Sequence, residues 1–237
     1  HAVDLARGPD GRMWVVNDRT EAPSGMGYAL ENRSTSSRIL PEMFAKMNVK
    51  RLSGFFQKFN QMLIDAAPGK KENPNIVILT PGSHNETYFE HAYMASFLGY
   101  PLVQGNDLVV RDGFLWMKSL QGLKQIDVVL RRVDDAFTRK NVSVINPIGS
   151  GVIENPGLIP FMPAIAKYFL KEELILPQIA SWWCGQEKEK NYVLENLSKL
   201  VVKRIDRTNR ESIYFGELMS AKEIDALKKV IIERPYR

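Results

Sequence analysis

The sequence predicts a mixed α/β protein, and three patterns lead to this prediction. Short, continuously apolar runs, such as 76–79 and 126–130, are typical of strands buried on both faces of a parallel sheet. Amphipathic stretches with helical spacing separate these runs. Strands that alternate with helices favour an open sheet, whose binding crevice lies at the carboxyl ends of its strands.

Composition is that of an ordinary globular protein and excludes few functions. The 237 residues, 44% apolar and 25% charged, can bury one large core or two small ones. The net charge of +5 suits an anionic small ligand as well as a polynucleotide. The basic residues are scattered rather than striped, so we expect no nucleic-acid partner. Oligomeric state is left open by these features.

Two further features of the sequence bear on the cellular location of the protein. No apolar run approaches the ~20 residues that span a bilayer, so we expect no membrane partner. The single cysteine, Cys184, can form no internal disulfide, which favours a reducing cytoplasm. The chain starts at His1, inside a predicted strand, and stops just after a helical pattern, so we expect it to be a piece of a longer protein.

A β-hairpin is predicted at the amino terminus. Its turn, Pro9-Asp10-Gly11, supplies a fixed φ, an Asx turn and a position for positive φ. Trp14, Val15 and Val16 give the second strand β-forming bulk. Asp4 and Asp18 would then lie on neighbouring strands, both near the end away from the turn.

Two converging carboxylates are costly unless a cation or a proton lies between them. Their oxygen atoms suit a hard ion such as Mg²⁺. The alternative is an ordinary surface hairpin, in which the aspartates are solvated or paired with Arg7, Arg12 or Arg19.

The next 60 residues are predicted to be mainly helical. One helix ends near Ile39, and a second, short one begins at Pro41, because proline interrupts the pattern. Apolar residues at helical spacing over 51–66 predict a helix that packs on the core. The polar stretch 67–75 is a plausible domain boundary.

Strand, loop and helix then alternate, which is typical of a βαβ unit. A strand at 76–79 leads through a glycine-bearing loop into a helix over about 86–98. Further short strands are expected at 101–103, 126–130 and 142–145. A hairpin turns at Asp112-Gly113.

Polar residues follow the ends of three of these strands. The candidate substrate-binding residues at these ends are Asn85, Glu86, Arg131, Asp134 and Ser150. Each has a structural alternative: Asn85 can cap its helix, Arg131 and Asp134 can form an internal ion pair, and Gly149-Ser150-Gly151 can be only a turn.

The last third of the chain is again mixed. Helices are expected over 157–170 and 187–197, and a capping box at Ser220 opens the last helix. Cys184, between Trp183 and Gly185, is expected to be a packed residue and not a nucleophile. The strand 200–203 places Lys203 at its end.

The opening residues, Asp4 to Trp14 and Asp18 to Arg33, resemble the start of the circularly permuted ATP-grasp proteins, a bacterial family often described as related to glutathionylspermidine synthase. The similarity continues through the motifs that begin at Thr80, Gly105, Arg131, Asn146, Ser181 and Leu200. It therefore covers nearly the whole chain, in order.

The resemblance implies a fold in which two α+β halves hold ATP between them. Residues 1–48 would be the permuted metal-binding segment and 49–69 a helical connector. Residues 70–150 would be a Rossmann-like domain that precedes the ATP-grasp halves, and 151–237 would begin the nucleotide-binding half.

It also implies roles for individual residues. Asp4 and Asp18 match Mg²⁺ ligands, and Lys203 matches the strand lysine that contacts ATP phosphates. Arg7 would neutralise charge, and Arg19 with Thr20 would belong to the catalytic set. Ser24 and Gly25 would lie in a loop near the transferred phosphate.

Some residues depart from the family pattern. Asn17-Asp18-Arg19 stands where many relatives carry Glu-Asp-Asn, so one expected carboxylate is missing. A helical stretch is lacking between Arg139 and Lys140, and no glycine-rich loop follows Lys203. The chain also stops before the adenine-binding hinge.

Two functions remain open at this point. The first is an ATP- and Mg²⁺-dependent ligase that joins a carboxylate to an amine, with an amino-acid or peptide-like substrate. The second is a non-catalytic protein of the same fold that binds a nucleotide or a peptide. The retained Asp4, Asp18 and Lys203 favour the first, and the change at Asn17 favours the second.

Overall fold

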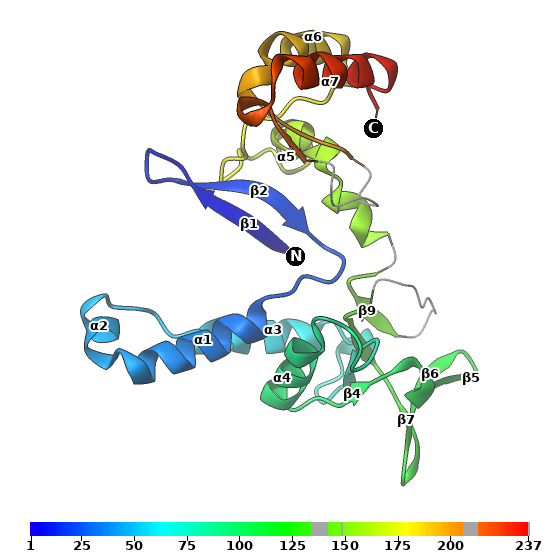
Figure 1. Cartoon of the computed structure of the whole chain (residues 1–237). Helices are drawn as coiled ribbons and strands as arrows, with labels where there is room; N and C mark the ends of the chain where they lie inside the picture. The colour runs from blue at the N-terminus through cyan, green and yellow to red at the C-terminus, as the bar shows by residue number, and fades with distance from the viewer. Residues whose placement is uncertain (134–141, 148, 206–212, 237) are drawn as a thin grey trace. The chain divides into compact units, whose positions relative to one another are not determined.

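The computed structural model (Figure 1) describes residues 1–133, 142–147, 149–205 and 213–236. The chain forms two compact units. Unit 1 comprises His1–Ala2 and Arg19–Gly151, and unit 2 comprises Val3–Asp18 and Val152–Arg237. The amino-terminal hairpin therefore belongs to the same unit as the last third of the chain. The assignment of segments to the two ATP-grasp halves stays a prediction.

Unit 1 is an α/β unit with two small sheets. Its helices are α1 (Met26–Ile39), α2 (Pro41–Lys46), α3 (Ser53–Asp65) and α4 (Tyr88–Leu98). Its strands are β3 (Ile76–Leu79), β4 (Leu102–Val103), β5 (Leu108–Arg111), β6 (Phe114–Ser119), β7 (Gly122–Gln125), β8 (Val128–Arg131) and β9 (Ser143–Ile145). The predicted break between two helices at Pro41 is confirmed.

The predicted parallel sheet is present, with strand order β4-β3-β8-β9 and every neighbouring pair parallel. Both faces of β3 are buried, because Ile76 and Ile78 pack toward α3 and α4 while Val77 and Leu79 pack toward Leu115 of β6. This two-sided burial explains why the strand is a continuous apolar run. The carboxyl ends of all four strands meet at one edge of the sheet.

The second sheet of unit 1 is an antiparallel meander, β5-β6-β7. The predicted Asp-Gly hairpin is confirmed, since Asp112 and Gly113 both have positive φ, 51° and 79°, as a two-residue hairpin turn requires. The third strand, β7, was not predicted. Its residues carry little apolar signal, because three of the four are exposed.

In its described residues, unit 2 combines a hairpin, three helices and a two-stranded ribbon. The hairpin is β1 (Ala2–Arg7) and β2 (Met13–Arg19), and Gly11 has φ +78° in its turn. The other elements are α5 (Met162–Leu170), α6 (Glu187–Asn196), β10 (Val201–Lys203), β11 (Ile213–Phe215) and α7 (Ala221–Glu233). Short 3₁₀ turns include η4 (Pro156–Phe161), η5 (Leu197–Lys199) and η6 (Gly216–Leu218).

The core of unit 2 lies between α6 and α7. Val193 and Leu197 are buried there together with Leu227 and Ile231 of α7. The capping box at Ser220 is also confirmed: its hydroxyl accepts from the Glu223 amide while the Glu223 carboxylate accepts from the Ser220 amide. None of the helices in the described part of the chain is long and apolar enough to cross a membrane.

Candidate functional site

The amino-terminal hairpin brings Asp4 and Asp18 to one end of unit 2, as predicted. Asn17 Nδ2 donates a hydrogen bond to Asp4 Oδ2 over 3.3 Å, across the two strands. Val15 forms a parallel bridge with Gln178, through which β2 is held to the 177–179 segment. Gln178 Nε2 in turn lies 3.4 Å from Asp18 Oδ2.

Asp18 is the more buried of the two carboxylates, and this burial raises the pKa of its side chain by disfavouring the charged form. The Oε1 atom of Gln178 is buried and accepts no hydrogen bond from the described residues. Gln178 presents its Nε2 donor to Asp18, so a cation at this place would be held by carboxylate oxygens, which are ligands that Mg²⁺ accepts.

The donor set is small, however. Among the described residues, no group of three or more histidine, cysteine, aspartate or glutamate side chains is placed to hold a metal. A cation at Asp4 and Asp18 would therefore depend on amide oxygens, water or phosphate for its remaining ligands. This is the way in which Mg²⁺ is usually bound together with nucleotide phosphates.

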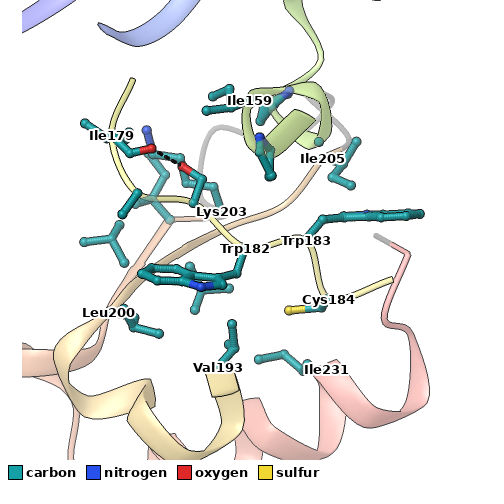
Figure 2. A pocket seen from close by; sticks show the side chains of 18 of the residues that line it. Ile159, Ile179, Trp182, Trp183, Cys184, Val193, Leu200, Lys203, Ile205 and Ile231 are labelled. Carbon is teal, nitrogen blue, oxygen red and sulfur yellow. Dashed lines mark hydrogen bonds between the residues drawn. The ribbon is translucent and has the colours of Figure 1, made fainter. Parts of the chain in front are cut away.

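Beside the hairpin, unit 2 contains a pocket with a volume of about 590 Å³ (Figure 2). Asn17 of β2 and Lys203 of β10 both line it, so the residue that contacts Asp4 and the predicted phosphate-binding lysine share one cavity. Most of the other lining side chains are apolar, among them Ile159, Ile179, Trp182, Trp183, Leu200, Ile205, Ile213 and Phe215. An apolar cavity with a few polar groups is typical of small-molecule sites.

The two tryptophans of this pocket have different environments, and Figure 2 shows them pointing away from one another. Trp182 packs toward the unit 2 core, and its ring centroid lies 4.7 Å from that of Tyr192. The Nε1 atom of Trp183 is buried and donates no hydrogen bond to the described residues. Cys184 packs against the same core, and burial raises the pKa of its thiol, which agrees with the expected packing role.

A second group of predicted residues lies at the carboxyl edge of the parallel sheet in unit 1. The Thr20 hydroxyl donates to the Ser150 carbonyl oxygen. Arg131 is buried at the end of β8, donates to the Asn146 carbonyl over 2.7 Å and lies 3.6 Å from the Glu21 carboxylate. The loop of residues 20–25, called the 20s loop, is therefore held directly on the sheet edge that is predicted to bind substrate.

Glu90 of α4 fixes the other end of that loop. Its carboxylate is fully buried and accepts from the backbone amides of Gly25 and Met26, over 2.6 and 2.9 Å. Arg132 completes the arrangement, because its guanidinium lies 3.0 Å from Glu90 and also donates to the Pro23 carbonyl. The amide of Gly25, predicted to lie near phosphate, is thus engaged by a carboxylate.

The remaining predicted residues are placed as follows. Arg7 is exposed at the turn end of β1, and Arg19 is exposed at the end of β2. Ser24 and Glu86 are exposed in unit 1. Asp134 lies outside the described residues, so its proposed pairing with Arg131 stays a prediction.

Asn85 does not occupy the N-cap position of α4, which belongs to Thr87. Its Oδ1 atom instead accepts from the amide and the hydroxyl of Thr87. Four residues that hold the candidate site residues in place were not predicted from the sequence: Glu90, Arg132, Gln178 and the buried His91, which lies 3.0 Å from Thr87 Oγ1. Only Glu90, His91 and Arg132 had a signal, since they lie within motifs already singled out.

Comparison with protein families agrees with the motif pattern. The model for circularly permuted ATP-grasp type 2 matches residues 1–140 and 135–237. An uncharacterized protein of Mycobacterium tuberculosis is 39% identical over 97% of this chain and 28% of its own length.

Two other uncharacterized relatives are similar over most of this chain. One from Synechocystis is 33% identical, covering 93% of this chain and 50% of the relative. One from Mycobacterium leprae is 32% identical, covering 98% of this chain and 45% of the relative. The chain thus spans half or less of the length of these three relatives. The chain belongs to the circularly permuted ATP-grasp type 2 family.

Proposed function

We propose that this chain is part of an ATP- and Mg²⁺-dependent ligase that joins a carboxylate to an amine. The observation that carries the proposal is the placement of Lys203 and Asn17 around one pocket, with Asp4 hydrogen-bonded to Asn17. Membership of the family supports an ATP-dependent reaction.

Lys203 would contact the phosphates of a nucleotide that enters the pocket. Its side chain is exposed at the end of β10, on the lining of the pocket. The apolar walls around Trp183 would hold the base.

Asp4 and Asp18 would hold Mg²⁺, with Asn17 and Gln178 orienting the two carboxylates through the hydrogen bonds described above. Bound there, the ion would neutralise charge on the phosphate oxygens. Arg7 and Arg19 are assigned to charge neutralisation, and Thr20, Ser24 and Gly25 to the loop near the transferred phosphate.

The reaction assigned to the intact protein has two steps. A substrate carboxylate oxygen takes the terminal phosphoryl group of ATP and releases ADP, which forms an acyl phosphate. The nitrogen of an amine then attacks the acyl carbon, and inorganic phosphate leaves as the amide bond forms. Such chemistry depends on positioning and electrostatics and needs no protein nucleophile.

The carboxylate substrate is assigned to the sheet edge of unit 1, with Asn85, Glu86, Arg131, Asp134 and Ser150 as its binding residues. An amino-acid or peptide-like substrate, as in glutathionylspermidine synthase, fits this assignment. The lone Cys184 fits a reducing cytoplasm.

A non-catalytic nucleotide- or peptide-binding protein is the second candidate. Asn17 favours it, because a carboxamide that donates to Asp4 stands where the family resemblance implies a carboxylate. One fewer negative charge weakens any Mg²⁺ site formed with Asp4 and Asp18.

Replacement of Lys203 tests the nucleotide pocket. We expect Lys203→Gln to weaken binding of a non-hydrolysable ATP analogue by about ten- to a hundred-fold, because one charge-assisted hydrogen bond is lost. Isothermal titration calorimetry measures the change. Lys222→Gln, at an exposed lysine of α7 in the same unit, is the matched control and should bind as the unchanged protein does. Equal affinity in all three proteins would remove Lys203 from the site.

A further inference from the structure

A chain of hydrogen bonds runs from the loop after β3 into α4. The Gly82 amide donates to Thr80 Oγ1 over 3.2 Å, and Thr80 Oγ1 lies 2.9 Å from His91 Nδ1. The other ring nitrogen, His91 Nε2, lies 3.0 Å from Thr87 Oγ1. Thr87 donates to Asn85 Oδ1 twice, from its amide over 2.9 Å and from its hydroxyl over 2.6 Å.

The protonation of His91 follows from its surroundings. Its side chain is 2% exposed, and burial together with the nearby Arg132 charge lowers its pKa to about 4, although Glu90 acts in the opposite direction. The imidazole is therefore neutral at physiological pH and carries a single ring proton.

The direction of each hydrogen bond can then be worked out by counting protons. The hydroxyl proton of Thr87 is used on Asn85 Oδ1, so toward His91 this hydroxyl can only accept. The ring proton of His91 must therefore be on Nε2. His91 Nδ1 is then an acceptor, and it receives the hydroxyl proton of Thr80.

The backbone amide of Thr87, which can only donate, shows independently which way round the Asn85 carboxamide lies. Because Oδ1 is occupied by the two donors of Thr87, the Nδ2 amino group faces away from Thr87 with two N–H donors. Asn85 is half-buried in the loop that follows β3. β3 pairs in parallel with β8, so this loop and Arg131 at the end of β8 lie at the same edge of the sheet.

We propose that His91 is a positioning residue that acts through Thr87 to hold Asn85 with its Nδ2 donors directed at a carboxylate oxygen of the substrate. The inference rests on the proposed function, because it takes this sheet edge as the binding site of the acyl donor. It also goes further, since it predicts that Asn85 donates to the substrate and does not accept from it. N–H donors form charge-assisted hydrogen bonds with carboxylate oxygens, which favours an anionic substrate group at this edge.

The first test needs no ligand. Nitrogen-15 spectra of the histidine side chains should show His91 protonated on Nε2 and bare on Nδ1, and this state should persist at every pH well above 4. A proton on Nδ1, or a charged ring at neutral pH, would overturn the assigned polarity. This result does not depend on whether the protein binds ATP.

The second test uses acetate as the probe, titrated at constant ionic strength while the Asn85 side-chain amide resonance is followed. The unchanged protein and Thr87→Ser, which keeps the hydroxyl, should show the same saturable shift. Thr87→Val removes the hydroxyl and should bind acetate about tenfold more weakly, as expected for the loss of one ordering hydrogen bond. Asn85→Asp keeps the acceptor for Thr87 but replaces the donor and has no side-chain amide of its own. In this variant the Thr87 backbone amide resonance is followed instead, and the affinity for acetate should be lost.

His91→Gln provides a conservative replacement, because its carboxamide can still donate to Thr87. It should retain acetate binding within about threefold, whereas His91→Leu should lose about tenfold. Circular dichroism confirms that each variant is folded. Equal acetate affinity in Thr87→Val and the unchanged protein, or no shift with acetate in either, would overturn the proposal. Nucleotide binding, measured separately in unit 2, would be unaffected by that outcome.

Discussion

Glu90→Ala is expected to lower the free energy of unfolding of unit 1 by about 3–5 kcal/mol, the usual cost of leaving one member of a buried ion pair without its partner. Glu90 is 0% exposed and Arg132 4% exposed, and the two are joined over 3.0 Å. The substitution also leaves the amides of Gly25 and Met26 without their acceptor. Urea-induced unfolding measures the loss.

A matched control is Glu72→Ala, at an exposed glutamate of the same unit, which should change stability by no more than about 0.5 kcal/mol. A second variant, Glu90→Leu with Arg132→Met, removes both charges and should recover part of the loss. Hydrogen exchange at Gly25 and Met26 should accelerate in Glu90→Ala. A cost below about 1 kcal/mol would show that this pair does not hold the 20s loop.

Gly216→Ala is expected to destabilise unit 2 to a similar extent, lowering its free energy of unfolding by about 3 kcal/mol or more. A Cβ atom at Gly216 would overlap the Leu197 carbonyl oxygen and lie 2.9 Å from the Leu200 carbonyl oxygen. These neighbours are backbone atoms, and Leu197 is itself buried in the core between α6 and α7, so no flexible side chain can move aside.

The effect should reach the pocket, because Leu200 and Phe215 beside this glycine both line it. Gly54→Ala is the control: Gly54 is exposed in α3 with no atom within 4 Å of a Cβ added there, so it should gain about 0.5–1 kcal/mol from helix propensity. Thermal unfolding distinguishes the two substitutions. If Gly216→Ala unfolds at the same temperature as the unchanged protein, then Gly216 does not pack as closely on the backbone of η5 as described.

Much of the fold could be predicted because the signals were local. The Pro9-Asp10-Gly11 turn, the Asp112-Gly113 turn and the capping box at Ser220 each depend on a few adjacent residues whose backbone preferences are strong. Strands β7 and β11 were missed, because short strands with exposed side chains leave little periodicity to detect.

Apolar periodicity also did not guarantee burial. Leu40, Met43 and Met47 have helical spacing, yet their exposed fractions are 51%, 56% and 71%. Spacing tells which residues share a helix face, but whether another element covers that face depends on tertiary packing.

The candidate site was only partly predictable for a similar reason. Asp4, Asp18 and Lys203 belong to recognisable motifs, but Gln178 reaches Asp18 only through the parallel bridge to Val15, a contact between residues far apart in the chain. The Glu90–Arg132 pair likewise joins α4 to the residue just after β8. Such pairs become visible only when the fold is known.

Metal-dependent nucleotide binding is the most direct test of the proposed ligase chemistry. Calorimetric titration with a non-hydrolysable ATP analogue should show tighter binding with Mg²⁺ than with a chelator. Asp18→Asn, which keeps the shape of the side chain and removes the burial cost of its charge, should fold normally and lose that Mg²⁺ dependence. Binding that is indifferent to Mg²⁺ in both proteins, or absent from both, would contradict the proposed site.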